Sequence, residues 1–113
     1  DAGVRRLSKR ALENYGYRVL DAPDGESALA LADRHPGRIA VLVTDVVMPR
    51  MSGAVVAEQL THRHPHIRVL FVSGYIDDAI VRHGVMEGHH AFLQKPFLPY
   101  ALAAKVREVL DQP

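Results

Sequence analysis

The sequence predicts an α/β fold in which a parallel sheet carries helices on both faces. Two observations lead to this prediction. Segments with helical periodicity alternate with short apolar segments along the chain, which is typical of strands and helices joined by right-handed crossovers. Two of the apolar segments, Ile39–Thr44 and Arg68–Ser73, are rich in β-branched residues and do not alternate with polar ones. Such runs are expected of strands that helices cover on both faces.

The other predicted elements fit the same alternating order. Val4–Tyr15 has apolar residues at helical spacing and is followed by Gly16, a residue that commonly ends helices. Tyr17–Leu20 is predicted as a short strand, and the turn at Pro23-Asp24-Gly25 separates it from a second helix that stops before Pro36. The remaining predicted elements are a helix at Ala54–His62, a helix at Asp77–His83, a strand at Ala91–Gln94 and a helix at Tyr100–Leu110.

Composition favours one soluble domain and argues against several classes of function. The chain has 113 residues, of which 48% are hydrophobic and 24% are charged, and this is the balance of a globular domain. The 14 basic and 13 acidic side chains are spread along the sequence, so we expect neither a nucleic-acid nor a membrane contact from this segment. There is no cysteine, which suits a reducing compartment, and a cytoplasmic location is expected.

Three polar side chains are predicted at the ends of strands. Asp45 follows the first buried strand, Ser73 ends the next one, and Lys95 follows the last one. Because the carboxyl ends of parallel strands meet at one edge of the sheet, we expect these side chains to converge. A carboxylate nucleophile, a hydroxyl donor and a cation are the groups that phosphoryl transfer requires, apart from a metal ion.

Three segments of the sequence resemble the signatures of response-regulator receiver domains. They are V-L-V-T-D-V-V-M-P-R-M-S-G at Val41–Gly53, F-V-S-G-Y at Phe71–Tyr75, and F-L-Q-K-P-F at Phe92–Phe97. Their order and separation are similar to those of the family, and the resemblance covers Val4–Leu110. It implies a flavodoxin-like, doubly wound parallel sheet with the strand order 2-1-3-4-5.

The resemblance also implies roles for individual residues. By this resemblance Asp45 is the phosphorylated aspartate, Ser73 is the switch hydroxyl, and Lys95 is the lysine that pairs with the phosphoryl group. Mg²⁺ would bind Asp45 and the backbone carbonyl of Val47, and the Lys95-Pro96 bond would be cis, which proline permits at modest cost.

Two groups of residues have open interpretations. Phe92 falls where the family often has a switch aromatic, although a plain core role is equally compatible with a phenylalanine. The histidines between positions 62 and 66 and at positions 89 and 90 invite a metal hypothesis. Pro65 interrupts the first series and no cysteine or carboxylate completes either set, so we interpret them as solvated loop histidines.

The first strand of the family is not visible in the sequence. Receivers hold Mg²⁺ through an acidic pair that ends this strand, and here a helix begins almost at Asp1. We expect the pair just before Asp1, which makes residues 1–113 a receiver domain without its N-terminal strand; alternatively, Asp1 is the second carboxylate. The missing strand belongs between Tyr17–Leu20 and Ile39–Thr44, so we expect an upstream apolar strand, strand exchange, dimerisation or re-pairing to fill the gap.

Two functions remain open at this point. The first is phosphorelay signalling, in which a histidine kinase or phosphotransfer domain delivers a phosphoryl group to Asp45 and the surface around the family's fourth helix, fifth strand and fifth helix then changes. The segment itself would catalyse at most its own dephosphorylation. The motifs also resemble receivers at the ends of hybrid sensor histidine kinases, so the parent chain is expected to be such a kinase. The second function is that of a pseudo-receiver, which acts only as a protein-interaction module.

Overall fold

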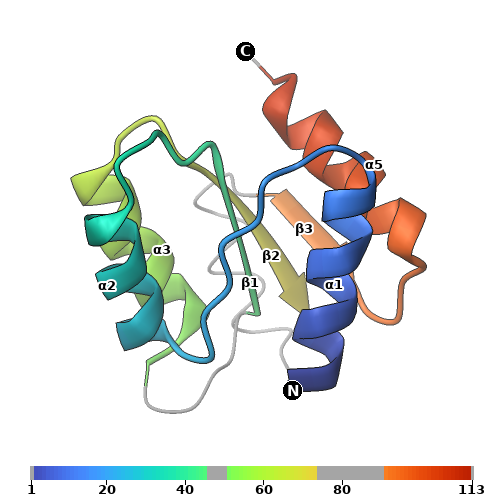
Figure 1. Ribbon diagram of the computed structural model, residues 1–113, viewed down its shortest axis with the longest axis horizontal. Coiled ribbons are helices and arrows are strands. Elements are labelled where there is room, and N and C mark those ends of the chain that lie inside the picture. Colours follow the sequence, from blue (N-terminus) through green and yellow to red (C-terminus); the bar gives the residue numbers. More distant parts are fainter. Residues whose placement is uncertain (1, 46–50, 74–90, 113) are drawn as a thin grey trace.

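The computed structural model describes residues 2–45, 51–73 and 91–112, and its elements form three layers (Figure 1). A parallel sheet lies in the middle, with α1 and α5 on one face and α2 and α3 on the other. This is the doubly wound α/β arrangement that the alternating sequence predicts. The elements are α1 (Ala2–Asn14), α2 (Gly25–Arg34), β1 (Val41–Asp45), α3 (Gly53–Arg63), β2 (Arg68–Ser73), β3 (Ala91–Gln94) and α5 (Pro99–Leu110).

The sheet has the strand order β1-β2-β3, and both pairs of neighbours are parallel. Its register places Val41 opposite Arg68 at one end of β1 and Asp45 opposite Val72 at the other. On the next pair, Ser73 lies opposite Gln94. The carboxyl ends of the three strands therefore meet at one edge of the sheet.

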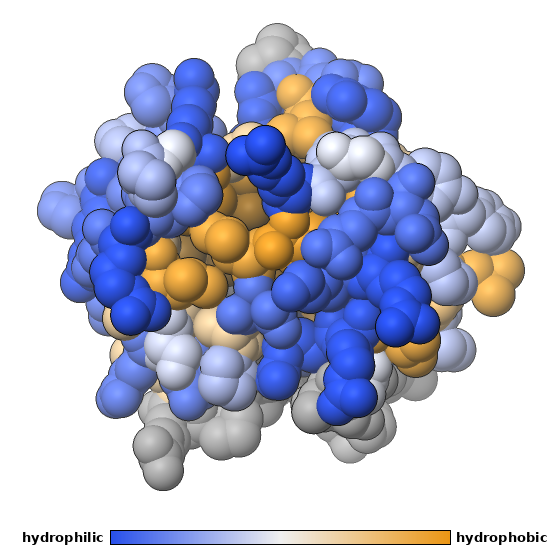
Figure 2. Space-filling model, in the orientation of Figure 1, coloured by the Kyte–Doolittle hydropathy of each residue, from blue (hydrophilic) through white to orange (hydrophobic). Residues whose placement is uncertain are grey.

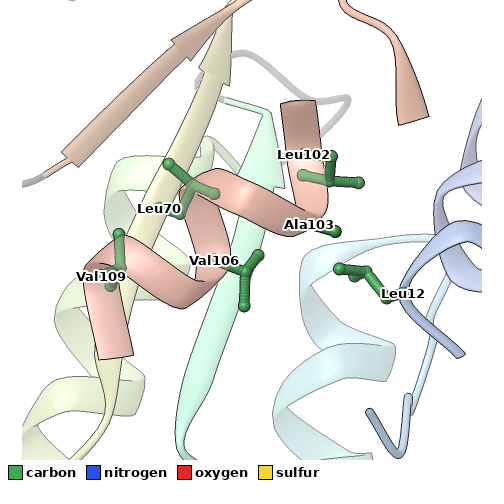
Figure 3. Close-up of a cluster of buried hydrophobic side chains, with 6 residues drawn as sticks. All are labelled: Leu12, Leu70, Leu102, Ala103, Val106 and Val109. Carbon is green, nitrogen blue, oxygen red and sulfur yellow. The ribbon is translucent and has the colours of Figure 1, made fainter. Parts of the chain in front are cut away.

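Both faces of the sheet are packed with apolar side chains. On one face, Leu12 of α1 and Leu70 of β2 belong to a buried cluster in which α5 supplies the remaining members (Figure 3). On the other face, α2 and α3 bury a second cluster, which includes Leu29 and Val56. Each fully buried aliphatic side chain of this kind contributes about 1.5–3 kcal/mol to folding. The α5 residues of the first cluster are Leu102, Ala103, Val106 and Val109.

Three helix starts show how the sequence fixes the ends of these elements. The Asp24 side chain accepts a hydrogen bond from Ser27 N at 2.8 Å and caps α2, and Ser52 Oγ accepts one from Val55 N at 3.2 Å and caps α3. Leu98 precedes α5 and makes no side-chain cap, although Pro99 occupies the first turn. At α2 and α3, therefore, an Asp or Ser side chain accepts from an N–H group that has no partner within the helix, as is usual at helix starts.

Most of the predicted elements are confirmed. The strands at Arg68–Ser73 and Ala91–Gln94 have the predicted bounds, and β1 begins two residues later than the predicted Ile39. The predicted helices at Val4–Tyr15, Ala54–His62 and Tyr100–Leu110 each lie within two residues of an observed helix at both ends. The helix predicted at Asp77–His83 lies outside the described residues.

The strand predicted at Tyr17–Leu20 is wrong for the described structure, because this segment joins no described sheet. A β-strand needs a neighbour that accepts and donates backbone hydrogen bonds, and none of the described strands pairs with this segment. Tyr17 and Val19 instead pack against the cluster that contains Leu12 and Leu70. Figure 2 shows apolar side chains gathered at the centre of the face between α1 and α2, where this segment and β1 run.

Candidate functional site

Asp45 and Lys95 form an ion pair at the carboxyl edge of the sheet. Asp45 is the last residue of β1, and Lys95 directly follows β3. Lys95 Nζ lies 2.7 Å from Asp45 Oδ1, so the lysine side chain spans the end of the intervening strand, β2. The Lys95 side chain is 32% exposed and the Asp45 side chain is 41% exposed. The pair is therefore open to solvent and to a reacting group from outside.

The backbone of Ser73 completes this edge of the sheet. Ser73 is the last residue of β2, and it lies one residue beyond Val72, the partner of Asp45. The Lys95-Pro96 peptide bond that follows β3 is cis, as the family resemblance implies. Two further predicted participants, Val47 and Asp1, lie outside the described residues.

Two residues that the sequence reasoning gave no role contact the backbone of Asp45. Thr44 Oγ1 donates a hydrogen bond to the Asp45 carbonyl oxygen at 3.0 Å. Gly53, at the start of α3, lies so close to the same carbonyl that a Cβ placed on it would overlap the oxygen and would lie 2.8 Å from the carbonyl carbon. The only sequence signal for this contact is the glycine itself, at the end of the segment that begins at Val41.

The comparison with known families decides what kind of domain carries this site. The model of the response regulator receiver domain matches residues 1–107. The chain belongs to this family. Receiver domains act in two-component phosphorelay signalling, and the match confirms the resemblance of the three sequence segments.

Relatives of this receiver domain include a kinase and a small regulator. It is 39% identical over 109 residues to the sensor kinase CckA of Brucella abortus and 30% identical over 110 residues to the response regulator receiver protein CpdR of the same organism. The matches cover 96% and 97% of this chain, but 12% of CckA and 90% of CpdR. A probable transcriptional regulator, ycf27 of Porphyridium aerugineum, is 32% identical over 97% of this chain and 45% of its own length.

Solved structures share the fold of this receiver domain. A response regulator receiver domain protein from Clostridium thermocellum has a TM-score of 0.85 at 24% identity, over 98% of this chain and 88% of its own. The receiver domain of NtrX from Brucella abortus also has a TM-score of 0.85, at 23% identity, over 100% of this chain and 94% of its own. At these identities the likeness establishes the doubly wound fold alone.

Phe92 of this receiver domain packs inward. Its ring lies against Phe71, with the ring centroids 5.9 Å apart and the planes tilted by 33°. Phe92 is partly buried beside a cluster that includes Ala57, Val69 and Phe71. Aromatic pairs at this separation contribute about 0.5–1.5 kcal/mol beyond the area they bury. In this conformation Phe92 therefore acts as a core residue.

A second cluster of charges joins α1 to the segment that precedes α2. Asp21 accepts hydrogen bonds from Lys9 Nζ and from Arg5 Nε, both at 3.3 Å. The hydrogen bond from Lys9 is the largest of the effects that lower the pKa of Asp21, and Arg5 acts in the same direction. The Asp21 carboxylate therefore stays ionised to a lower pH than an isolated aspartate.

The histidines do not form a metal centre in the part of the chain that the structure describes. The interpretation as solvated loop histidines holds for His66, which is exposed outside the helices. It is wrong for His62, which is exposed but belongs to α3, and for His64, whose Nε2 is buried with no hydrogen-bond partner among the described residues. Positions 89 and 90 lie outside the described residues. Within residues 2–45, 51–73 and 91–112, no three side chains of His, Cys, Asp or Glu gather around a common point. In the same ranges, every helix is too short or too polar to cross a membrane.

Proposed function

We propose that this receiver domain accepts a phosphoryl group on Asp45 from a phosphohistidine and signals by a change of its surface. The observation that carries the proposal is the 2.7 Å contact between Lys95 Nζ and Asp45 Oδ1 at the carboxyl edge of the sheet. A carboxylate nucleophile beside a fixed ammonium is suited to phosphoryl transfer, because charge on the transferred oxygens needs a nearby cation. Family membership supports the same role for the domain as a whole.

The proposed reaction is a transfer between two protein side chains. A carboxylate oxygen of Asp45 forms a bond to phosphorus while the N–P bond of the donor phosphohistidine breaks. The electron pair of the broken bond returns to the imidazole nitrogen, which is then protonated from solvent. Lys95 then holds its ammonium toward the phosphoryl oxygens. The family resemblance assigns the switch hydroxyl to Ser73, whose side chain lies outside the described part of the structure.

Mg²⁺ fits this site in part. Asp45 supplies a carboxylate, which is the kind of hard oxygen ligand that Mg²⁺ prefers, and Mg²⁺ commonly binds through one or two carboxylates together with phosphate oxygens and water. The backbone carbonyl of Val47 is the second proposed ligand, and it lies outside the described residues. When bound, Mg²⁺ would offset the negative charge of the phosphoryl group.

The similarity to CckA, at 39% identity, favours a kinase as the parent protein over a small regulator like CpdR, of which the match covers 90% at 30% identity. Almost the whole of this chain matches CckA and ycf27, but the match covers only 12% of CckA and 45% of ycf27. We therefore propose that residues 1–113 form a receiver domain in the cytoplasmic part of a hybrid sensor kinase. The proposed partner of this receiver domain is a histidine kinase or phosphotransfer domain. The proposed output surface consists of β3, α5 and the segment that precedes β3.

One observation favours a second candidate, a pseudo-receiver that only binds other proteins. Asp45 is the one carboxylate within the described strands β1, β2 and β3, so water and phosphate oxygens would have to supply most of the Mg²⁺ ligands there. In that case Asp45 and Lys95 would serve only as an ion pair.

Mass spectrometry of the full-length protein distinguishes the two candidates. The protein is incubated with Mg²⁺ and acetyl phosphate, and separately with a phosphorylated histidine kinase, and the modified peptide is then mapped. A receiver gains one phosphoryl group on the peptide that contains Asp45. An unmodified protein under both conditions would support the pseudo-receiver instead.

A further inference from the structure

Thr44 is unusual in the core of this domain. Among the described residues, it is the one polar side chain in the buried class, with 8% of its surface exposed. The three residues before it in β1 are Val41, Leu42 and Val43, so a valine of similar shape would suit the strand. High strand propensity explains a threonine at this position, but it does not explain why a hydroxyl is buried. A buried hydroxyl costs free energy unless it has a hydrogen-bond partner.

The Thr44 hydroxyl hydrogen-bonds to the backbone of the proposed phosphoacceptor. Thr44 Oγ1 donates to the Asp45 carbonyl oxygen at 3.0 Å, and the Cα of Gly53 contacts the same carbonyl. A Cβ on Gly53 would also lie 3.1 Å from Thr44 Oγ1. The hydroxyl and the glycine therefore both lie against the Asp45 carbonyl, and both Thr44 and Gly53 are buried.

The neighbours of Thr44 across the sheet hold it in place. Thr44 lies opposite Phe71 on β2, and Phe71 lies opposite Phe92 on β3. Phe71 is 1% exposed, and its ring packs against that of Phe92. This row of side chains limits the movement of Thr44, because closely packed neighbours leave little free volume.

We infer that Thr44 is a positioning residue for phosphoryl transfer to Asp45. Its hydroxyl fixes the carbonyl of Asp45 and thereby the direction in which the Asp45 side chain leaves the strand toward Lys95. Reactions of this type depend on the alignment of nucleophile and cation, so a small misplacement of Asp45 lowers the rate. The inference rests on the proposed function of Asp45 and adds a residue that does not touch the phosphoryl group.

The test compares four variants of the full-length protein. Thr44→Val and Thr44→Ala remove the hydroxyl, and Thr44→Ser retains it. The fourth variant, Val69→Ala, weakens the core cluster that contains Phe71, at the opposite end of β2 from the site. For each variant, the rate of phosphorylation is measured over a range of acetyl phosphate concentrations at saturating Mg²⁺, together with the melting temperature. We expect Thr44→Val and Thr44→Ala to lower the maximal rate about fivefold, the scale of one hydrogen bond. Thr44→Ser stays within about twofold of the wild type.

The comparison separates positioning from general stability. Thr44→Val and Thr44→Ala differ in how well they fill the core, so they should differ in melting temperature while losing the same rate. Val69→Ala should lower the melting temperature and leave the rate unchanged. Equal rates for wild type and Thr44→Val, an equal loss in Thr44→Ser, or an equal loss in Val69→Ala would each overturn the role of Thr44. An unlabelled wild-type protein would instead remove the proposed function itself, and the role of Thr44 with it.

Discussion

Lys95 Nζ lies 2.7 Å from Asp45 Oδ1 although β2 separates the strands that carry the two residues. About a third of the Lys95 side chain and two fifths of the Asp45 side chain remain exposed. Ion pairs that are this exposed stabilise a fold by about 0–1 kcal/mol, because water screens both charges. The contact is therefore better suited to chemistry at the edge of the sheet than to stabilising the sheet.

Replacement of Lys95 should separate signalling from stability. We expect Lys95→Ala to slow phosphoryl transfer or uncouple it from output, and to change the free energy of unfolding by less than about 1 kcal/mol. Arg63→Ala is the matched control, because Arg63 also pairs with a carboxylate, that of Asp33 at 2.7 Å, but lies on α3, away from the proposed output surface. Labelling kinetics and urea unfolding of both variants provide the measurement. Equal labelling and equal output in Lys95→Ala and the wild type would contradict the role of the lysine.

Gly53→Ala should damage the site through the backbone of Asp45. The added methyl would overlap the Asp45 carbonyl, so either α3 or the end of β1 must move, at a cost of about 1–3 kcal/mol. We expect slower phosphorylation together with a lower melting temperature. In the control Gly37→Ala, the methyl would meet only the flexible His35 side chain, at 3.1 Å from Nε2. The phosphorylation rate and the melting temperature of this control should therefore stay near the wild-type values. A Gly53→Ala protein that matches the wild type in both would show that the close contact is unimportant.

The charge cluster at Asp21 predicts a small dependence of stability on pH. Its pKa in the folded protein is lowered, first by the hydrogen bond from Lys9 and then by Arg5. The stabilisation is therefore present above the unfolded pKa of 3.8 and is lost as the pH falls through the folded value. Exposure to solvent keeps the effect small. Urea unfolding should show that Asp21→Asn loses more stability relative to the wild type at pH 7 than at pH 2.5, and the difference at pH 7 should shrink in 1 M NaCl. A stability difference that is the same at both pH values would contradict this.

The fold was predictable where the sequence carries its own signal. Arg68–Ser73 is a continuous apolar, β-branched run, and its strand has the predicted bounds. Tyr17–Leu20 has a similar composition, yet it joins no described sheet. Strand formation depends on a hydrogen-bonding neighbour, which local composition does not reveal. The difference between these two segments lies in their partners and not in their residues.

The site could be predicted only where a general rule relates a residue's place in the sequence to its position in the fold. Asp45 and Lys95 follow predicted strands, and the rule that the carboxyl ends of parallel strands meet places them together. No such rule connects Gly53 to the Asp45 carbonyl, because this contact depends on how closely α3 approaches β1. The contact of Thr44 is local to β1, but it depends on a side-chain rotamer that the sequence does not state. The inward packing of Phe92 also depended on a neighbour, Phe71, whose ring position the sequence does not state.

Labelling of Asp45→Asn beside Asp33→Asn tests whether Asp45 is the phosphoacceptor. Asp33 is a matched control, since it also forms a 2.7 Å ion pair with a basic side chain, that of Arg63, but it lies on α2. Both substitutions are nearly isosteric, and circular dichroism should show two folded proteins. With Mg²⁺ and a phosphodonor, we expect Asp33→Asn to gain one phosphoryl group at the wild-type rate and Asp45→Asn to gain none. Labelling of Asp45→Asn at the wild-type rate would contradict the assignment of Asp45 as the phosphoacceptor.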